Sequence, residues 1–170
     1  FIPITYGGGI KNLKDIENCL KNGADKVSIN THSINSNGKL IERASKEFGS
    51  QCIISNIEAK KIENEWFCYT DGGRINSGIR IQDWIKNIQE KNVGEIFVQS
   101  IDHDGFTDGP DYKLIEYLKN KIKVPFIIGS GFRSYEHLKR VKKIINSDAV
   151  CFSSALHHKD LNIKKIKKII

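Results

Sequence analysis

Two stretches of the sequence share one pattern, Pro3-Ile-Thr-Tyr-Gly-Gly-Gly-Ile10 and Pro125-Phe-Ile-Ile-Gly-Ser-Gly-Phe132. In each, an apolar run typical of a strand ends in a cluster of glycines. A chain gives up side chains at neighbouring positions where its backbone turns sharply or approaches something closely. The pattern therefore predicts a strand followed by a tight, glycine-rich loop at both places.

These two stretches belong to a longer internal repeat. The second begins 122 residues after the first, and residues 23–31 resemble residues 146–154 at nearly the same offset. An offset of this size holds four units of strand plus helix. Two such halves make a (β/α)₈ barrel of about 250 residues.

Short apolar runs alternate with amphipathic segments throughout, which indicates an α/β fold, either doubly wound or a TIM barrel, and the repeat favours the barrel. Runs rich in Ile and Val without polar alternation are typical of the buried strands of a parallel sheet. The predicted strands are Ile2–Tyr6, Lys26–Ile29, Cys52–Ile57, Glu95–Ser100, Pro125–Ile128 and Ala149–Phe152. The predicted helices are Leu13–Asn22, Gly38–Phe48, Ile79–Lys91, Tyr112–Lys121, Tyr135–Ile145 and Ile163–Ile170.

A complete barrel has eight strands, and six are predicted here. We therefore expect residues 1–170 to be a single domain, a fragment of a barrel built from two half-barrel repeats, without about the first two βα units. One interval, residues 59–78, is too long for a simple crossover. Within it, Trp66–Thr70 followed by Asp71–Arg74 predicts a small hairpin on the loop after the third strand. Such insertions commonly shape or cover a site.

Composition restricts the class of protein. The net charge is +7, but the lysines cluster in helical stretches, so a solvated surface explains it better than a nucleic acid partner. No apolar run approaches the roughly 20 residues of a membrane span. The four cysteines form no Cys-x-x-Cys pair, which argues against zinc or redox chemistry and fits a reducing cytoplasm. We expect no metal and no cofactor.

Polar residues and glycines follow the predicted strands at the face where barrel enzymes carry out chemistry. Backbone amides in glycine-rich loops at helix N-termini form anion sites, and phosphate is the usual ligand. Two such loops four units apart fit a substrate with a phosphate at each end. The alternative is that the glycines only make tight turns. The predicted phosphate-binding residues are Gly8, Gly9, Asn30, Thr31, Asp104, Gly105, Gly129, Ser130, Gly131, Ser153 and Ser154.

Two carboxylates are candidates for acid/base catalysis. Glu58 and Asp102 each follow an apolar strand, where partial burial tunes a pKa for proton transfer. The competing interpretations are structural: Asp102 and Asp104 would cap a loop, and Glu58 would pair with a neighbouring lysine.

Several motifs resemble the cyclase subunit of imidazole glycerol phosphate synthase. They are Gly7-Gly-Gly-Ile10, Gly23-Ala-Asp-Lys-Val-Ser-Ile-Asn-Thr31, Phe48-Gly-Ser-Gln51 and Ser100-Ile-Asp-His-Asp-Gly105. The resemblance implies a barrel enzyme of histidine biosynthesis, a heterodimer with a glutaminase subunit whose ammonia passes through the barrel. It also implies a bisphosphorylated ribonucleotide substrate, cyclised to imidazole glycerol phosphate with release of an aminoimidazole carboxamide ribonucleotide.

The sequence departs from that family at several points. The family uses two aspartates, of which the first would precede residue 1, so the resemblance implies that this chain alone is inactive. The second aligns with Glu58, which is longer by a methylene, and Phe106 replaces a small polar residue. Two alternatives follow. One is a paralogue that supplies ammonia for amidation of a surface-polysaccharide sugar, and the other is a non-catalytic phosphate-binding barrel.

Overall fold

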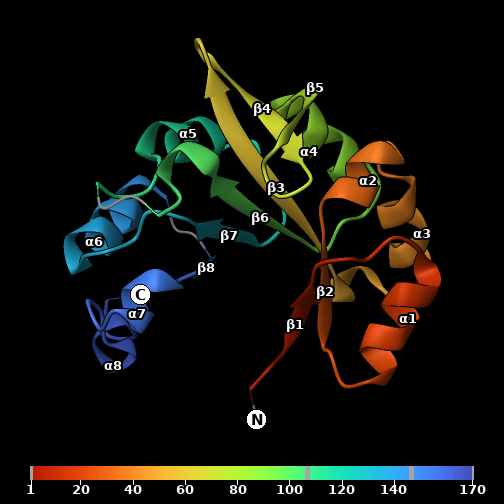
Figure 1. The fold of residues 1–170 in the computed structure, drawn as a ribbon, viewed down its shortest axis with the longest axis horizontal. Helices are drawn as coiled ribbons and strands as arrows, with labels where there is room; N and C mark the ends of the chain where they lie inside the picture. The colour runs from red at the N-terminus through yellow and green to blue at the C-terminus, as the bar shows by residue number, and fades with distance from the viewer. Residues whose placement is uncertain (1, 106–107, 146–147, 170) are drawn as a thin grey trace.

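Six parallel strands form one curved sheet in the computed structural model, which describes residues 2–105, 108–145 and 148–169. Figure 1 shows the sheet with helices along its outer side. The strand order follows the chain, as expected when each βα unit adds the next strand. The parallel strands are β1 (Thr5–Gly7), β2 (Lys26–Ile29), β3 (Ile53–Ile62), β6 (Glu95–Ser100), β7 (Phe126–Gly129) and β8 (Ala149–Val150).

Helices connect these strands, and the predicted alternation is confirmed. The connection after β1 starts cleanly because Asn12 and Asp15 form a reciprocal capping box at the first helix. The α-helices are α1 (Leu13–Lys21), α2 (Thr31–Asn35), α3 (Lys39–Phe48), α4 (Ile81–Glu90), α5 (Tyr112–Leu118), α6 (Tyr135–Ile144), α7 (Ser154–His157) and α8 (Ile163–Ile166). Two short 3₁₀ turns are η1 (Ser50–Cys52) and η2 (Ile101–His103).

The two faces of the sheet differ in chemistry. Residues that point outward pack under the helices, and Val27, Ile53, Ile57 and Ile96 are fully buried there. Residues at the alternate positions point inward because side chains alternate along a strand. The inward positions of β3, for example, are Ile54, Asn56 and Glu58, which border an open cavity. The outer face therefore supplies the core, and the inner face is free to carry a site.

An antiparallel arm interrupts the βα pattern where a hairpin was predicted. The expectation that β3 would end at Ile57 is wrong, because β3 runs to Ile62 and pairs with β4 (Glu65–Thr70). β4 in turn pairs with β5 (Ile75–Arg80) through the turn 71–74. The predicted helix start at Ile79 is wrong for the same reason, since Ile79 and Arg80 belong to β5.

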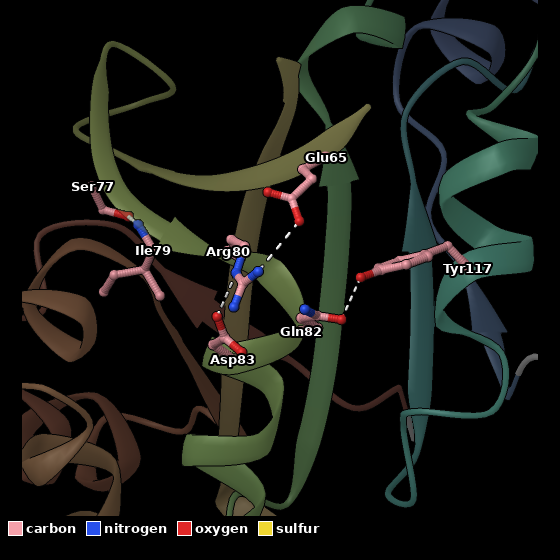
Figure 2. A network of polar contacts seen from close by, with 7 residues as sticks. All are labelled: Glu65, Ser77, Ile79, Arg80, Gln82, Asp83 and Tyr117. Atoms are coloured by element: carbon pink, nitrogen blue, oxygen red, sulfur yellow. Dashed lines mark hydrogen bonds and ion pairs between the residues drawn. The ribbon is translucent and has the colours of Figure 1, made fainter. Parts of the chain in front are cut away.

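Polar contacts fasten this arm to the body of the protein. Figure 2 shows Arg80 between Glu65 of β4, at 3.4 Å, and Asp83 of α4, at 2.8 Å. Nearby, the Tyr117 hydroxyl of α5 donates to the Gln82 side chain of α4. Exposed ion pairs of this kind contribute little individually. Of the three contacts, Arg80–Asp83 links the end of the arm to α4, Arg80–Glu65 joins the two strands of the arm, and Tyr117–Gln82 joins α5 to α4.

The ends of the chain differ from the predicted bounds. The first strand begins at Thr5, not Ile2, because the Ile4 N–H donates to the Asp25 carboxylate at 2.7 Å instead of joining the ladder. The last helix ends at Ile166, after which the chain continues in tighter turns. Helices α2 and α7 were not predicted. Phe106 and the repeat positions 146–147 lie outside the described residues.

Within the described residues, β1 and β8 each pair on one side only. The chain before and along β1 is correspondingly open to solvent, with Ile2 84% and Tyr6 51% exposed. Unpaired edges with exposed apolar side chains favour association with other strands. The observed sheet is of the TIM-barrel type, a curved parallel sheet with outer helices, and it is open between β1 and β8.

Candidate functional site

A cavity of about 1300 Å³ lies on the inner side of the sheet and reaches the carboxyl ends of the strands. This is the face at which barrel enzymes place their active sites. The cavity lining includes the first glycine loop, the β2–α2 junction, β3 and the β4–β5 turn. Its chemically informative lining residues are Gly8, Gly9, Asn30, Thr31, Glu58 and Asp71.

Glu58 is the carboxylate that enters this cavity. It points inward from β3, is half-buried, and accepts a hydrogen bond from Asn30 Nδ2 at 2.9 Å. Burial raises the pKa of Glu58 above its ordinary value. Hydrogen bonds from the Gly73 backbone amide and from Asn30 oppose that rise, and the negative charges of Asp104 and Asp71 add to it. A half-buried carboxyl with a raised pKa is suited to transferring protons near neutral pH.

Asn30 and Thr31 lie where β2 passes into α2, and both contact the β4–β5 arm. Asn30 Nδ2 also donates to the Tyr69 carbonyl at 3.1 Å. Thr31 Oγ1 accepts a hydrogen bond from the Asp71 N–H at 3.0 Å. Both residues were predicted as phosphate ligands. They line the cavity beside Gly8 and Gly9, and they also hold the arm.

The first glycine loop is open. Gly8 and Gly9 have φ of 101° and 70°, which side chains rarely tolerate. A methyl group added to either would meet no atom within 4 Å. Their backbone therefore borders free space in the cavity, as an anion site requires.

The second glycine loop is packed. A methyl group on Gly129 would lie 2.6 Å from the Phe97 ring, and one on Gly131 would lie 2.4 Å from the Gly109 carbonyl oxygen. Ser130 adopts a φ of 74°, and its hydroxyl oxygen is buried without a hydrogen-bond partner among the described residues. Ser153 and Ser154 lie at the start of α7. These positions do not line the cavity that contains Glu58.

The loop after β6 contains the second predicted carboxylate. Asp102 accepts a hydrogen bond from the Lys61 backbone N–H at 2.8 Å and lines a separate groove of about 560 Å³. The structure therefore does not bring Asp102 and Glu58 together. The negative charge of Asp104 raises the pKa of Glu58, and Gly105 has a φ of 75°. His103 Nδ1 lies 2.8 Å from the Gly109 carbonyl oxygen, which ties down the loop.

An ion pair lies on the inner face of the sheet, at the end of the strands opposite to Glu58. Lys26 of β2 and Glu95 of β6 face inward near the start of their strands and form a salt bridge across the sheet. Strand register places Glu95 level with Ile54 and Gln99 level with Glu58. The ion pair is thus separated from Glu58 by about 13 Å along the strands, at about 3.3 Å per residue.

The sequence indicated that the insertion with the β4–β5 turn shapes or covers a site. It did not identify Asp71, Gly72 and Gly73 individually as site residues. Asp71 and Gly72 line the cavity, and the Gly73 backbone amide lowers the pKa of Glu58. The signal available in the sequence was the Asp-Gly-Gly triplet itself, which favours backbone conformations that expose amides.

The described residues contain no cluster of three or more His, Cys, Asp or Glu side chains arranged to hold a metal ion. No helix among them is long and apolar enough to cross a membrane.

The curved parallel sheet, its outer helices and a site at the carboxyl ends of the strands define an α/β protein of the TIM-barrel type. The family model described as "Histidine biosynthesis protein" matches residues 1–162. The chain therefore belongs to the histidine biosynthesis protein family, as its sequence motifs predicted.

Three relatives that share one name match nearly the whole chain. The imidazole glycerol phosphate synthase subunit HisF of Dictyoglomus thermophilum is 42% identical over 171 residues, covering 100% of this chain and 67% of the relative. The HisF subunit of Bacillus cereus (strain Q1) is 40% identical, covering 99% of this chain and 67% of the relative. That of Clostridium botulinum (strain Okra) is 36% identical, covering 100% and 68%. The chain thus spans about two thirds of the length of these relatives.

Proposed function

We propose that the protein acts as the cyclase subunit of imidazole glycerol phosphate synthase in histidine biosynthesis. It would use ammonia from a glutaminase partner to convert phosphoribulosyl-formimino aminoimidazole carboxamide ribonucleotide into imidazole glycerol phosphate and aminoimidazole carboxamide ribonucleotide. Family membership and HisF relatives at about 40% identity support this cyclase function.

One observation carries the proposal: Glu58 and the open glycine loop at Gly8 and Gly9 line the same cavity. When ammonia attacks the ribulosyl carbonyl carbon, its nitrogen gains positive charge and must lose a proton. The carbonyl oxygen then leaves as water, and ring closure at the formimino carbon breaks that carbon's bond to the ribonucleotide nitrogen. Glu58 accepts that proton in its ionised form and returns one to the departing ribonucleotide nitrogen. Burial raises the pKa of Glu58, which makes its protonated form easier to reach than that of an ordinary exposed glutamate.

The phosphates of the substrate give the two glycine loops their proposed roles. One phosphate binds at Gly8 and Gly9, beside Asn30 and Thr31, where the loop faces open space. The other binds near Gly129–Gly131, with Ser153 and Ser154 and the Asp104-Gly105 loop. The Ser130 hydroxyl, which is buried and has no hydrogen-bond partner among the described residues, favours a ligand on that side, because a buried polar group without a partner is costly.

Ammonia would enter from the end of the sheet opposite to Glu58, where the glutaminase partner would dock. The inward Lys26–Glu95 pair lies at that end, so ammonia entering there would pass it. In the complete protein, further βα units would join β1 to β8 and enclose the cavity between two half-barrels. We place this assembly in the cytoplasm.

The test is turnover of the ribonucleotide by the full-length protein with ammonium salts, and with glutamine plus its partner. We expect turnover that Glu58→Gln abolishes and Glu58→Asp, the shorter carboxylate, retains. Lys60→Gln is a control, because it removes an exposed charge two residues away on the same strand. If the wild-type protein shows no turnover although it binds the ribonucleotide, the cyclase proposal is wrong. Ammonia supply to another acceptor, such as a surface sugar, would then be tested next.

A further inference from the structure

The turn between β4 and β5 has an unusual backbone. Asp71, Gly72 and Gly73 have φ of 56°, 66° and 76°, and the turn closes with the Arg74 N–H donating to the Thr70 carbonyl at 3.1 Å. Two of the three residues are glycines, which adopt such φ values freely, and aspartate is one of the few other residues that adopt them, at a greater cost than glycine. A non-glycine residue stays in this conformation when its surroundings hold it there.

Contacts from two other elements hold the turn. Thr31 Oγ1 accepts the Asp71 N–H at 3.0 Å, so it acts on the strained residue itself. Asn30, the preceding residue, donates to the Tyr69 carbonyl at the end of β4. From the other side, Ile101 lies beneath Gly73, where an added methyl group would come within 3.2 Å of it. The turn is thus held between the β2–α2 junction and η2.

Holding the turn matters because the turn lies at the carboxylate. Asp71 and Gly72 line the cavity with Glu58, Glu58 accepts a hydrogen bond from Asn30 Nδ2 at 2.9 Å, and the backbone amide of Gly73 lowers the pKa of Glu58. We propose that Thr31 is a positioning residue for Glu58, because its hydroxyl fixes Asp71 and thereby holds the Gly73 amide against the carboxylate. This inference rests on the proposed function in taking Glu58 as the group that transfers protons.

The same hydroxyl links the carboxylate to the first glycine loop. Thr31 lines the cavity with Gly8 and Gly9. Its contact to Asp71 uses an oxygen lone pair and leaves the hydroxyl hydrogen available for an anion. A phosphate bound at the loop would therefore orient the side chain that holds the turn.

The sign of the expected effect follows from the groups around Glu58. Asp71 of the turn and Asp104 of the loop after η2 carry negative charge that raises its pKa. Tyr69 lies opposite Glu58 on β4, Lys60 lies two residues along β3, and His32 and Lys11 line the same cavity. The Gly73 amide lowers the pKa of Glu58, so releasing the turn raises it further. Since the base must be ionised to accept a proton, the pH below which activity is lost would rise.

The experiment compares Thr31→Val, which keeps the shape and removes the hydroxyl, with Thr31→Ser, which keeps the hydroxyl. Hydrogen exchange of the Asp71 and Gly73 amides is measured in the full-length protein without phosphate, together with an NMR titration of Glu58. Loss of one hydrogen bond predicts exchange about threefold to tenfold faster in Thr31→Val and a higher Glu58 pKa. Thr31→Ser should restore both. Thr5→Val removes a hydroxyl from the same cavity without touching the turn, and should change neither.

A different outcome would overturn the inference. If Thr31→Val weakens inorganic phosphate binding but leaves Gly73 exchange and the Glu58 titration unchanged, Thr31 is a phosphate ligand and not a positioning residue. Should Thr31→Val fail to fold, Thr31→Ala provides the same comparison. None of these readouts requires cyclase turnover, so they decide the role of Thr31 even if the proposed reaction is wrong. Where turnover is measurable, the acidic limb of kcat/KM should move upward in Thr31→Val.

Discussion

The two glycine loops look alike in sequence but differ in what surrounds them. Around Gly8 and Gly9 there is open space, and the glycines are needed because their φ values are positive. Gly129 and Gly131 lie against the Phe97 ring and the Gly109 carbonyl, so they are needed because no side chain fits there. One pattern therefore has two physical causes, ligand access and close packing. A glycine cluster alone does not say which applies.

The loops also differ in their neighbouring carboxylates. Beside the first loop, Glu58 enters the cavity and receives side-chain and backbone hydrogen bonds. The second predicted carboxylate, Asp102, instead accepts a hydrogen bond from the Lys61 backbone and lines another groove. The first loop thus has the elements of a reaction site around it. The second has the elements of a binding or structural site.

The sharpest test of this difference compares Glu58→Gln with Asp102→Asn in the full-length protein. General acid/base catalysis typically contributes a factor of about 10²–10⁴, so Glu58→Gln should reduce ammonium-dependent turnover by at least the lower figure. Asp102→Asn keeps an oxygen that accepts the Lys61 N–H and should change turnover little. Steady-state kinetics with both variants provide the measurement. Equal losses in the two variants would contradict the separation of their roles.

The next test adds one methyl group to each loop and compares the loss of stability. Gly131→Ala forces a contact with a backbone carbonyl, and overpacking of this kind costs about 1–3 kcal/mol, to which the positive φ adds about 1 kcal/mol. Gly9→Ala carries only the second cost, because nothing lies within 4 Å. We expect a clearly lower Tm for Gly131→Ala and a slight decrease for Gly9→Ala. Equal Tm values would mean that the second loop relaxes and is not tightly packed.

These contrasts indicate where sequence reasoning succeeded. Periodicity and composition predicted the βα alternation, and β2 and β6 have the predicted bounds. Glu58 was identified because a carboxylate follows an apolar strand, and such a position is local in sequence. The packing around Gly129 and Gly131 depends on Phe97 and Gly109, which lie far from them in the sequence. The extension of β3 to Ile62 depends on pairing with β4, which the pattern of β3 alone does not contain.

A third test concerns anion binding at the two loops. A hydrogen bond to a charged group contributes about 1.5–3 kcal/mol, so a variant that disturbs one such contact should weaken phosphate binding about tenfold or more. We expect this loss for Gly9→Ala, with Ser130→Ala affecting only the second anion. Isothermal titration with inorganic phosphate, and a crystal soaked in a bisphosphate, measure the two sites separately. One anion only, or anions at the other end of the strands, would contradict a bipartite substrate site.

The smallest expected effect is on the pH dependence of stability, and it is specific to the first loop. The pKa of Glu58 is raised in the folded protein because burial disfavours its charge. The folded state therefore binds more protons than the unfolded chain in the window between the two pKa values, and stability falls as the pH rises through that window. The cost of the charge is present above the folded pKa and absent below about pH 4.

Glu58→Gln removes that charge while keeping an oxygen that accepts the Asn30 amide. We expect its Tm to exceed that of the wild-type protein slightly at neutral pH, with the difference disappearing as the pH falls toward 4. Thermal unfolding followed by circular dichroism at several pH values provides the measurement, and the exposed variant Lys60→Gln serves as the control. A variant that is less stable at neutral pH would mean that the charged carboxylate stabilises the fold. Glu58 would then be held as a structural anion, and the contrast between the two loops would not mark a site of proton transfer.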